Sequence, residues 1–273
     1  MKKLSSSDKE TIGVPFESSI YTHSHFGWFD CWQIVEDNGE LWLDESNYEK
    51  HLIALQFVSS DIIWLHSFFS DVPVETYPLA EKLKSILSPG KYCIYSISSQ
   101  NWYSSLLKKN GFRSSDEIIQ METDSIPIKY NRTFKEIQPF SPEQAEDIWN
   151  ECEKIFPSLW RLDLKEFSAA CKTSNYRRVL ILNGKISGYL LAEIDESDRN
   201  CDITRIVVYP EYQQKGYGRK FINQMVLECS TSNVKSYSVN TNKNNTAALN
   251  FYRELTFRQV DNSYPVYYRF LRI

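Results

Sequence analysis

The sequence predicts a mixed protein (α/β, of the α+β kind) with two similar lobes, each a mixed, mostly antiparallel sheet flanked by helices. Three observations support this fold class. The length of 273 residues suits two domains. Helical and strand-like patterns alternate through the second half. The first half repeats the later part of that order, which favours a duplicated fold over two unrelated lobes.

The second half opens with two predicted helices. The stretch SPEQ (141–144) has Ser at the N-cap, Pro in the first turn and Gln at the third position, so a helix should begin at residue 142. Apolar residues then recur every three or four positions until Pro157 interrupts the pattern. A second helix is expected over 163–172, and a short strand over 133–138 precedes both.

Strand patterns dominate the rest of the second half. Residues 178–182 and 186–194 flank Asn183-Gly184, which tolerates positive φ at both positions and predicts a tight hairpin turn. Residues 202–209 form a β-branched run that leads through a loop into a helix over 216–229. The remaining elements are a strand over 236–240, a helix over 245–255, and a closing pair of strands over 257–260 and 266–271.

The first half gives a fainter copy of this order. Placing Asn110-Gly111-Phe112 on Leu255-Thr256-Phe257 needs an offset of 145 residues. The pattern breaks at Asp124-Ser125-Ile126-Pro127, so we expect domains 1–125 and 126–273. The elements of the first half are strands over 61–69, 92–97 and 117–122, and helices over 76–87 and 102–109.

Composition and charge exclude several classes of protein. The chain is 42% hydrophobic and 24% charged, as globular domains are, and its formal net charge is −4. No strong positive field attracts nucleic acid or an anionic membrane, so we expect neither as a partner. The N-terminal MKKLSSSDKETIG lacks an apolar segment, and no run approaches the roughly 18 apolar residues of a spanning helix. A cytoplasmic monomer or homodimer is the default expectation.

The cysteines and histidines predict no metal site. No CxxC pair and no Cys–His spacing suits zinc, so reduced, mostly buried thiols are expected. His23-Ser24-His25 resembles a chelating HxH pair, but no third ligand is placed, and a surface loop is the preferred interpretation. The cysteines are Cys31, Cys93, Cys152, Cys171, Cys201 and Cys229.

The loop after residues 202–209 carries the strongest functional signal. It opens a helix whose first N–H groups lack helical partners and point, with the positive end of the helix dipole, beyond the strand. Gly216 and Gly218 let phosphate oxygens approach the backbone, and Lys215 and Arg219 add positive charge. A diphosphate is the natural ligand, although the pattern matches neither a P-loop nor GxGxxG and alone fits a plain loop-to-helix entry equally well.

Two motifs in this half resemble those of the GNAT superfamily of acyl-CoA-dependent N-acetyltransferases. The signature of Q or R, two residues, G, one residue, G or A is met by Gln213, Gly216 and Gly218. A later helix of that family matches in register, except that Thr256 replaces a Gly at its end. The resemblance covers about residues 130–273 and rests there on Asn245, Ala248, Phe251, Tyr252, Leu255 and Phe257.

The resemblance implies acetyl-CoA as co-substrate. The backbone N–H groups of residues 214–219 would hold its pyrophosphate, and the pantetheine arm would run as a pseudo-strand along residues 207–209 where two strands splay. Tyr252 would protonate the departing thiolate, although it also reads as an ordinary core aromatic. Asn245 would cap its helix beside the cofactor arm. The implied cofactor-binding residues are Val207, Val208, Tyr209, Gln213, Gln214, Lys215, Gly216, Tyr217, Gly218, Arg219, Asn245 and Tyr252.

The acceptor amine must lose a proton before it attacks, and Asp202 is the candidate base. It lies where some members of the family carry a glutamate, but a solvated carboxylate at a strand start explains it about as well; Glu193 is the reserve candidate. All four histidines lie in the first half, so direct attack in a ternary complex is favoured over an acyl-enzyme. The acceptor is expected to be a primary amine of a small molecule or a peptide.

The first half departs from the family pattern. After its strand at 61–69 comes SDVPVE (70–75), which has no glycine and carries an acidic pair at Asp71 and Glu75. The offset of 145 puts Leu107 where Tyr252 stands, so the proton donor is missing as well. We interpret this lobe as a degenerate copy kept for packing, for shaping the acceptor groove or for dimer contacts.

Acceptor identity and two alternatives stay open. Aromatic residues at 156–161 and 264–268, with Glu153, Asp163 and Glu166 nearby, favour a cationic amine with an apolar body. A non-catalytic acyl-CoA-binding module that engages a protein partner through the first lobe is the main alternative. A tandem aminoacyl transferase using charged tRNA is disfavoured by the intact glycine loop and the acidic balance.

Overall fold

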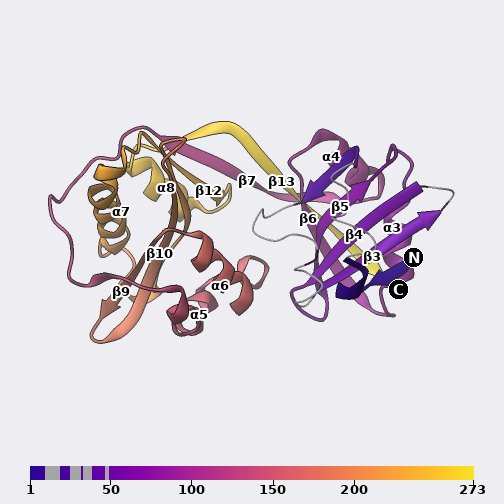
Figure 1. Cartoon of the computed structure of the whole chain (residues 1–273), viewed down its shortest axis with the longest axis horizontal. Coiled ribbons are helices and arrows are strands. Elements are labelled where there is room, and N and C mark those ends of the chain that lie inside the picture. Colours follow the sequence, from indigo (N-terminus) through magenta and orange to yellow (C-terminus); the bar gives the residue numbers. More distant parts are fainter. Residues whose placement is uncertain (10–18, 25–31, 33–38, 47–48) are drawn as a thin grey trace. The chain divides into compact units, whose positions relative to one another are not determined.

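The computed structural model describes residues 1–9, 19–24, 32, 39–46 and 49–273 (Figure 1). It confirms the predicted fold class, with mostly antiparallel strands and flanking helices. Contacts divide the chain into two compact units, Met1–Ile118 with Ser263–Ile273, and Ile119–Asn262. This division differs from the contiguous domains 1–125 and 126–273 because the last strand crosses from one unit to the other. None of the described helices has the length and apolar character of a membrane span.

The first unit is built on a sheet whose strand order is β1-β3-β4-β5-β6-β13, with β2 added beside β5. All the described pairings are antiparallel except that of β5 with β6. Helices α3 and α4 supply Leu79, Leu83 and Leu107 to the core. The elements are β1 (Lys2–Leu4), β2 (Tyr21–Ser24), β3 (Gly39–Ser46), β4 (Glu49–Phe57), β5 (Ile62–Ser70), α3 (Leu79–Ile86), β6 (Lys91–Ile97), α4 (Asn101–Lys109), the start of β7 (Arg113–Thr123) and the end of β13 (Arg258–Arg272).

The second unit holds the strand order β7-β12-β11-β10-β9-β8, with β11 and β12 parallel. Asn183 and Gly184 have φ of 51° and 74°, which confirms the predicted hairpin turn between β9 and β10. The capping box at Ser141 is also present, because the Gln144 side chain accepts the Ser141 N–H at 3.0 Å. The elements are β8 (Ile137–Pro139), α5 (Ala145–Cys152), α6 (Leu164–Thr173), β9 (Tyr176–Leu182), β10 (Lys185–Asp195), β11 (Asn200–Val208), α7 (Tyr217–Glu228), β12 (Ser236–Asn242) and α8 (Thr246–Glu254).

The predicted internal repeat is present. The series β5-α3-β6-α4-β7 has the same order as β11-α7-β12-α8-β13. Gly111 and Thr256, which the offset of 145 aligns, have φ of 73° and 69°. Each stands in the same helix-ending turn, in which Phe112 N–H donates to the Leu107 carbonyl and Phe257 N–H to the Tyr252 carbonyl, both at 3.0 Å.

Three local predictions were wrong. The closing pair of strands is one continuous strand, β13, because residues 261–265 stay extended. His23 is not in a surface loop: it lies in β2 and is 2% exposed, while His25 is outside the described residues. The strand expected over 133–138 is only β8, whose pairing with β9 begins at Ile137.

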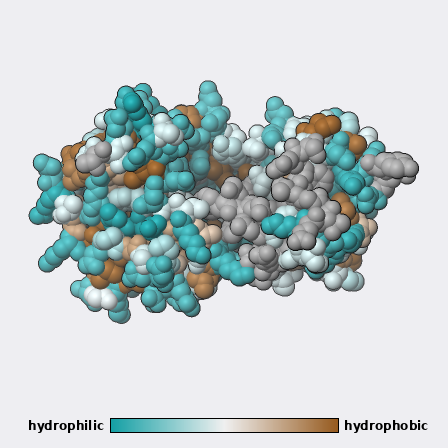
Figure 2. Space-filling model, viewed as in Figure 1, coloured by the Kyte–Doolittle hydropathy of each residue, from teal (hydrophilic) through white to brown (hydrophobic). Residues whose placement is uncertain are grey.

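The surface in Figure 2 is mostly hydrophilic, as the composition indicates. The described cysteines are free, and four of them are buried; Cys31 lies outside the described residues. Among the described residues, the large apolar side chains that are exposed are Met1, Ile20, Ile128, Phe270 and Ile273.

Candidate functional site

Strands β11 and β12 pair only at one end, and a cavity opens where they separate. Residues 200–203 pair in parallel with residues 236–239, whereas β10 follows β11 on its other side as far as Val208. Beyond Ile203, therefore, one edge of β11 has no strand beside it among the described residues. A cavity of about 860 Å³ lies there, lined by β11, the loop before α7, the end of β12 and α8.

Close packing and a bulge shape β11 along the opposite edge, where it pairs with β10. Gly188 on β10 lies opposite Val208, and a Cβ at Gly188 would approach the Val207 carbonyl oxygen to 2.5 Å, so only glycine fits. The register between β10 and β11 shifts between Leu191 and Glu193, so β11 carries an extra residue just after Asp202. Bulges of this kind change the direction of side chains and are common next to active sites.

The loop before α7 forms a cradle of main-chain donors. Gln214 and Gly216 have φ of 59° and 82°, separated by one residue, and alternation of this kind turns successive N–H groups toward one concavity. The first helical bond of this region is from Lys220 N–H to the Gly216 carbonyl, so the N–H groups of residues 217–219 lack helical acceptors. Residues 217–219 line the cavity, and the dipole of α7 favours an anion at this end of the helix.

The loop is held in place by its own motif residues. The Gln213 side chain donates to the Val208 carbonyl at 3.0 Å and ties the loop to the end of β11. A Cβ at Gly218 would touch the Phe251 ring at 3.3 Å, so this glycine lets α7 pack tightly on α8. At Gly216 there is open space, and the positive φ is what favours glycine. Arg219 donates to the Glu254 carbonyl at 3.2 Å, beside the cavity.

Tyr252 lies on α8 and lines the cavity, 5% exposed. Burial raises the pKa of its phenol, and the nearby Asp202 carboxylate raises it further. A neutral phenol facing a cavity is a proton or hydrogen-bond donor. Asn245 caps α8, because its side chain accepts the Ala248 N–H at 3.1 Å, and it lines the same cavity.

Asp202 lies on β11 and accepts a hydrogen bond from the Ser238 hydroxyl at 2.7 Å. Burial raises the pKa of this carboxyl, Glu193 on β10 adds to the rise, and the bond from Ser238 opposes it. Asp202 does not itself line the cavity. The described residues include no group of three His, Cys, Asp or Glu side chains that could hold a metal ion.

Most of the proposed cofactor-binding residues border the cavity, but not all. Val207 points to the other face of the sheet, where it pairs with Tyr189 and is 8% exposed. Tyr209 and Lys215 are also outside the lining, and Lys215 lies over the Tyr212 ring. Of the predicted cofactor-binding residues, those that line the cavity are Val208, Gln213, Gln214, Gly216, Tyr217, Gly218, Arg219, Asn245 and Tyr252.

Sequence reasoning missed Arg205. It lines the cavity, stacks on the Phe156 ring with 3.8 Å to the centroid, and donates to the Trp160 carbonyl at 2.7 Å. An arginine inside a β-branched run was the available signal. By contrast, Asp163 and Glu166 do not line the cavity; their side chains form the capping box of α6. The side chain of Glu153 lies outside the described residues.

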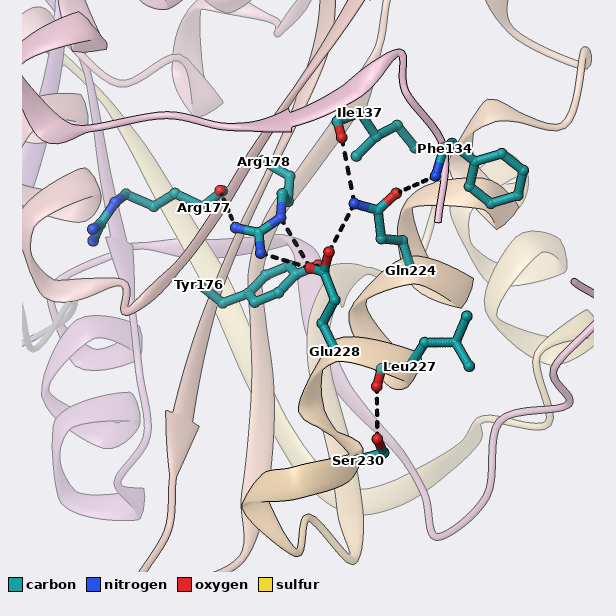
Figure 3. A network of polar contacts seen from close by, with 9 residues as sticks. All are labelled: Phe134, Ile137, Tyr176, Arg177, Arg178, Gln224, Leu227, Glu228 and Ser230. Atoms are coloured by element: carbon teal, nitrogen blue, oxygen red, sulfur yellow. Dashed lines mark hydrogen bonds and ion pairs between the residues drawn. The ribbon is translucent and has the colours of Figure 1, made fainter. Parts of the chain in front are cut away.

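A polar network fixes the other end of α7 (Figure 3). One oxygen of Glu228 accepts from the Arg178 guanidinium at 2.6 Å and from the Tyr176 hydroxyl at 2.6 Å. Its other oxygen accepts from Gln224 at 2.9 Å, and Gln224 in turn accepts the Phe134 N–H at 2.9 Å. These bonds tie α7 to β9 and to the segment before β8. They hold the helix in position, and with it the loop of main-chain donors at its N-terminus.

Comparison with known proteins identifies the domain. Residues 141–257 match the sequence model of the acetyltransferase (GNAT) family. An acetyltransferase from the GNAT family from Colwellia psychrerythraea is 13% identical, with 99% of each chain covered and a TM-score of 0.59. A tandem GNAT protein from the clavulanic acid biosynthesis pathway is 10% identical, with 99% of this chain and 97% of that chain covered and a TM-score of 0.58. A GCN5-related N-acetyltransferase from Sphaerobacter thermophilus is 11% identical, with 86% and 78% covered and a TM-score of 0.55.

Sequence comparison with curated proteins finds no match. The structural matches, all at low identity, establish the fold, and the sequence match establishes the family of the second half. Residues 141–257 therefore belong to the acetyltransferase (GNAT) family, within a chain that has the fold of tandem GNAT proteins.

Proposed function

We propose that this protein is an acetyl-CoA-dependent N-acetyltransferase that transfers an acetyl group to a primary amine by direct attack in a ternary complex. The observation that carries the proposal is the cradle of main-chain donors before α7, beside the open edge of β11. In this proposal the N–H groups of residues 214–219 would hold the diphosphate, and the edge of β11 beyond Ile203 would hold the extended arm; the absence of helical acceptors at residues 217–219 and the cavity beside that edge support it. Bound there, acetyl-CoA supplies an electrophilic thioester carbon.

Two residues of the chain would then act on the reacting groups, one by accepting a proton from the acceptor and one by donating a hydrogen bond to the departing sulfur. Asp202 is the proposed base for the acceptor ammonium, directly or through water, because its raised pKa makes it a stronger base than an exposed aspartate. Tyr252 would face the departing sulfur. A thiol holds its proton with a pKa near 8.5, below that of a buried phenol, so full transfer from Tyr252 is uphill and a strong hydrogen bond to the sulfur is its main contribution.

The acceptor would enter beside Phe156 and Arg205, which border the cavity. We propose a small-molecule or peptide amine as this substrate, and a monomer or homodimer as the working form. The acidic residues Asp163 and Glu166 are engaged in their own helix cap, so they give no support to a selection for cationic amines.

Binding of acetyl-CoA to Gly216→Glu tests the cradle. A carboxylate next to a diphosphate costs about 1 to 4 kcal/mol, so calorimetry should show affinity reduced by roughly 5- to 1000-fold. Gly184→Glu is the matched control: its φ of 74° is close to the 82° of Gly216, and a Cβ at either position would meet nothing within 4 Å. The control has the same strain and charge change but lies in the β9–β10 turn, so its affinity should match the wild type.

Turnover is tested with a panel of primary amines and detection of the released CoA thiol. Release that depends on an amine is the expected result. Acetyl-CoA binding without turnover on any amine would instead support the non-catalytic binding module. Absence of any binding by the wild type would remove the proposal altogether.

A further inference from the structure

The first unit contains the same splayed pair of strands as the second. Residues 62–64 of β5 pair in parallel with residues 93–95 of β6, and β5 then continues to Ser70 without β6. The register between β4 and β5 shifts between Ala54 and Leu55, so β5 carries one extra residue, His66, just after its parallel pairing ends. A bulge also lies at the end of the parallel pairing of β11.

The open edge of β5 is covered by the chain itself. Strand β2 (Tyr21–Ser24) pairs antiparallel with residues 67–70. Because β4 already occupies the opposite edge of β5 over residues 63–70, β2 must lie on the edge that β6 leaves. The Ser67 hydroxyl also donates to the Ser24 hydroxyl at 3.0 Å. The second unit has no such strand beside residues 204–208 among the described residues, and its cavity lies there.

The side chains of β2 seal this slot against α4. The His23 ring stacks on Tyr103 with 3.8 Å between centroids, and Tyr21 meets the Trp102 ring edge-on at 5.2 Å. Burial lowers the pKa of His23 to about 3, so the stacked ring is neutral. The offset of 145 places Tyr103 opposite Ala248, a small residue that lines the cavity of the second unit. The first unit therefore has the His23 ring stacked on Tyr103 at the position where the second unit has Ala248 beside its cavity.

We infer that the first unit is a closed copy of the slot in the second, with Tyr21–Ser24 as its built-in strand ligand, so that, among the described residues, only the second unit keeps a slot open to acyl-CoA. Its loop after β5 also lacks an anion cradle. Asp71 there accepts the Lys50 N–H at 2.9 Å, and the Ser70 hydroxyl accepts the Val72 N–H at 3.2 Å. These bonds fix an acidic, glycine-free turn.

Hydrogen exchange on the full chain tests this inference. Amides of residues 67–70 should exchange slowly without ligand, at a rate that acetyl-CoA does not change. Amides of residues 205–208 that face the cavity should exchange quickly and become slower with acetyl-CoA; this second part rests on the proposed function. Fast exchange at 67–70, slowing there on addition of acetyl-CoA, or two bound equivalents in calorimetry would overturn the inference. Unchanged exchange at 205–208 would count against the proposed function alone.

Variants of β2 provide the decisive comparison. N–H groups alternate in direction along a strand, so either Thr22→Pro or His23→Pro removes a donor that faces β5. Whichever of the two proline variants removes this donor should speed hydrogen exchange at residues 67–70 by at least about 10-fold and leave exchange at residues 200–203 unchanged. Thr22→Val keeps the N–H at an exposed position and is the matched control. His23→Ala removes the stacking without a proline and should also speed exchange at residues 67–70. If Thr22→Pro, His23→Pro and His23→Ala all left that exchange unchanged, the inference would be overturned.

Discussion

Tyr252 and Leu107 hold equivalent backbone positions, and their side chains account for much of the difference between the two units. Both accept the hydrogen bond that closes the turn after their helix. Leu107 is fully buried in the first core, whereas Tyr252 lines the cavity of the second unit. At this position, therefore, the duplicated backbone carries a donor-bearing side chain in the unit that has the cavity and an apolar one in the other.

Replacing Tyr252 with Phe isolates the phenol. The ring and its packing remain, so acetyl-CoA affinity should be retained, while turnover should fall by roughly 10²-fold because a positioned donor is lost. Tyr237→Phe is the control: Tyr237 is a buried tyrosine of the same core that does not line the cavity. Steady-state rates and calorimetry on both variants give the answer, and equal turnover for Tyr252→Phe would exclude that residue from the mechanism.

Residue-level prediction from the sequence succeeded where one side chain acts locally. Asn183-Gly184 and the cap at Asn245 depend on near neighbours, and the structure confirms both. His23 was misread as part of a loop because its burial depends on Tyr103, which lies 80 positions later. Thr256, which stands where the family has a Gly, has φ of 69°, and its hydroxyl bonds to the Thr123 hydroxyl at 3.0 Å, a contact that local sequence does not contain.

At the scale of elements, α7 joins the candidate site to the core. Its N-terminus offers unpaired donors to the cavity, and Glu228 near its C-terminus is held by Arg178 and Tyr176 (Figure 3). The sequence predicted the helix from its periodicity but not this network, since the partners lie 50 and 52 positions away. The network therefore fixes one end of the helix, while at the other end the N–H groups of residues 217–219 lack helical acceptors.

Removing the carboxylate of Glu228 should therefore destabilise the second unit. Glu228→Ala leaves Arg178, Gln224 and the Tyr176 hydroxyl without their shared acceptor, which should cost roughly 2 to 4 kcal/mol of unfolding free energy. Urea denaturation measures the change. Glu254→Ala is the control, because that side chain is 73% exposed and 4.0 Å from Arg219, and its loss should cost less than about 0.5 kcal/mol. Equal effects would mean that the network does not fix α7.

At the scale of the whole molecule, the sequence predicted the two-lobe fold but not which unit holds the end of the chain. Element order and the offset of 145 follow from short-range patterns. The 15 residues of β13 begin beside α8 in sequence and end paired with β6, where Val266 lies opposite Ile97. Sequence pattern gives the pairing partner of a strand only weakly, so a contiguous second domain was the natural expectation.

Leu271→Ala tests where the last strand belongs. Leu271 is 3% exposed in the core of the first unit, so its truncation should cost about 2 to 5 kcal/mol. Hydrogen exchange should become faster in β5 and β6 and stay unchanged in β10 and β11, because the lost contacts lie in the first unit alone. Phe270→Ala is the control on the same strand: Phe270 is 73% exposed, and its loss should cost less than about 0.5 kcal/mol. Faster exchange in β10 and β11 instead would mean that residues 263–273 pack with the second unit.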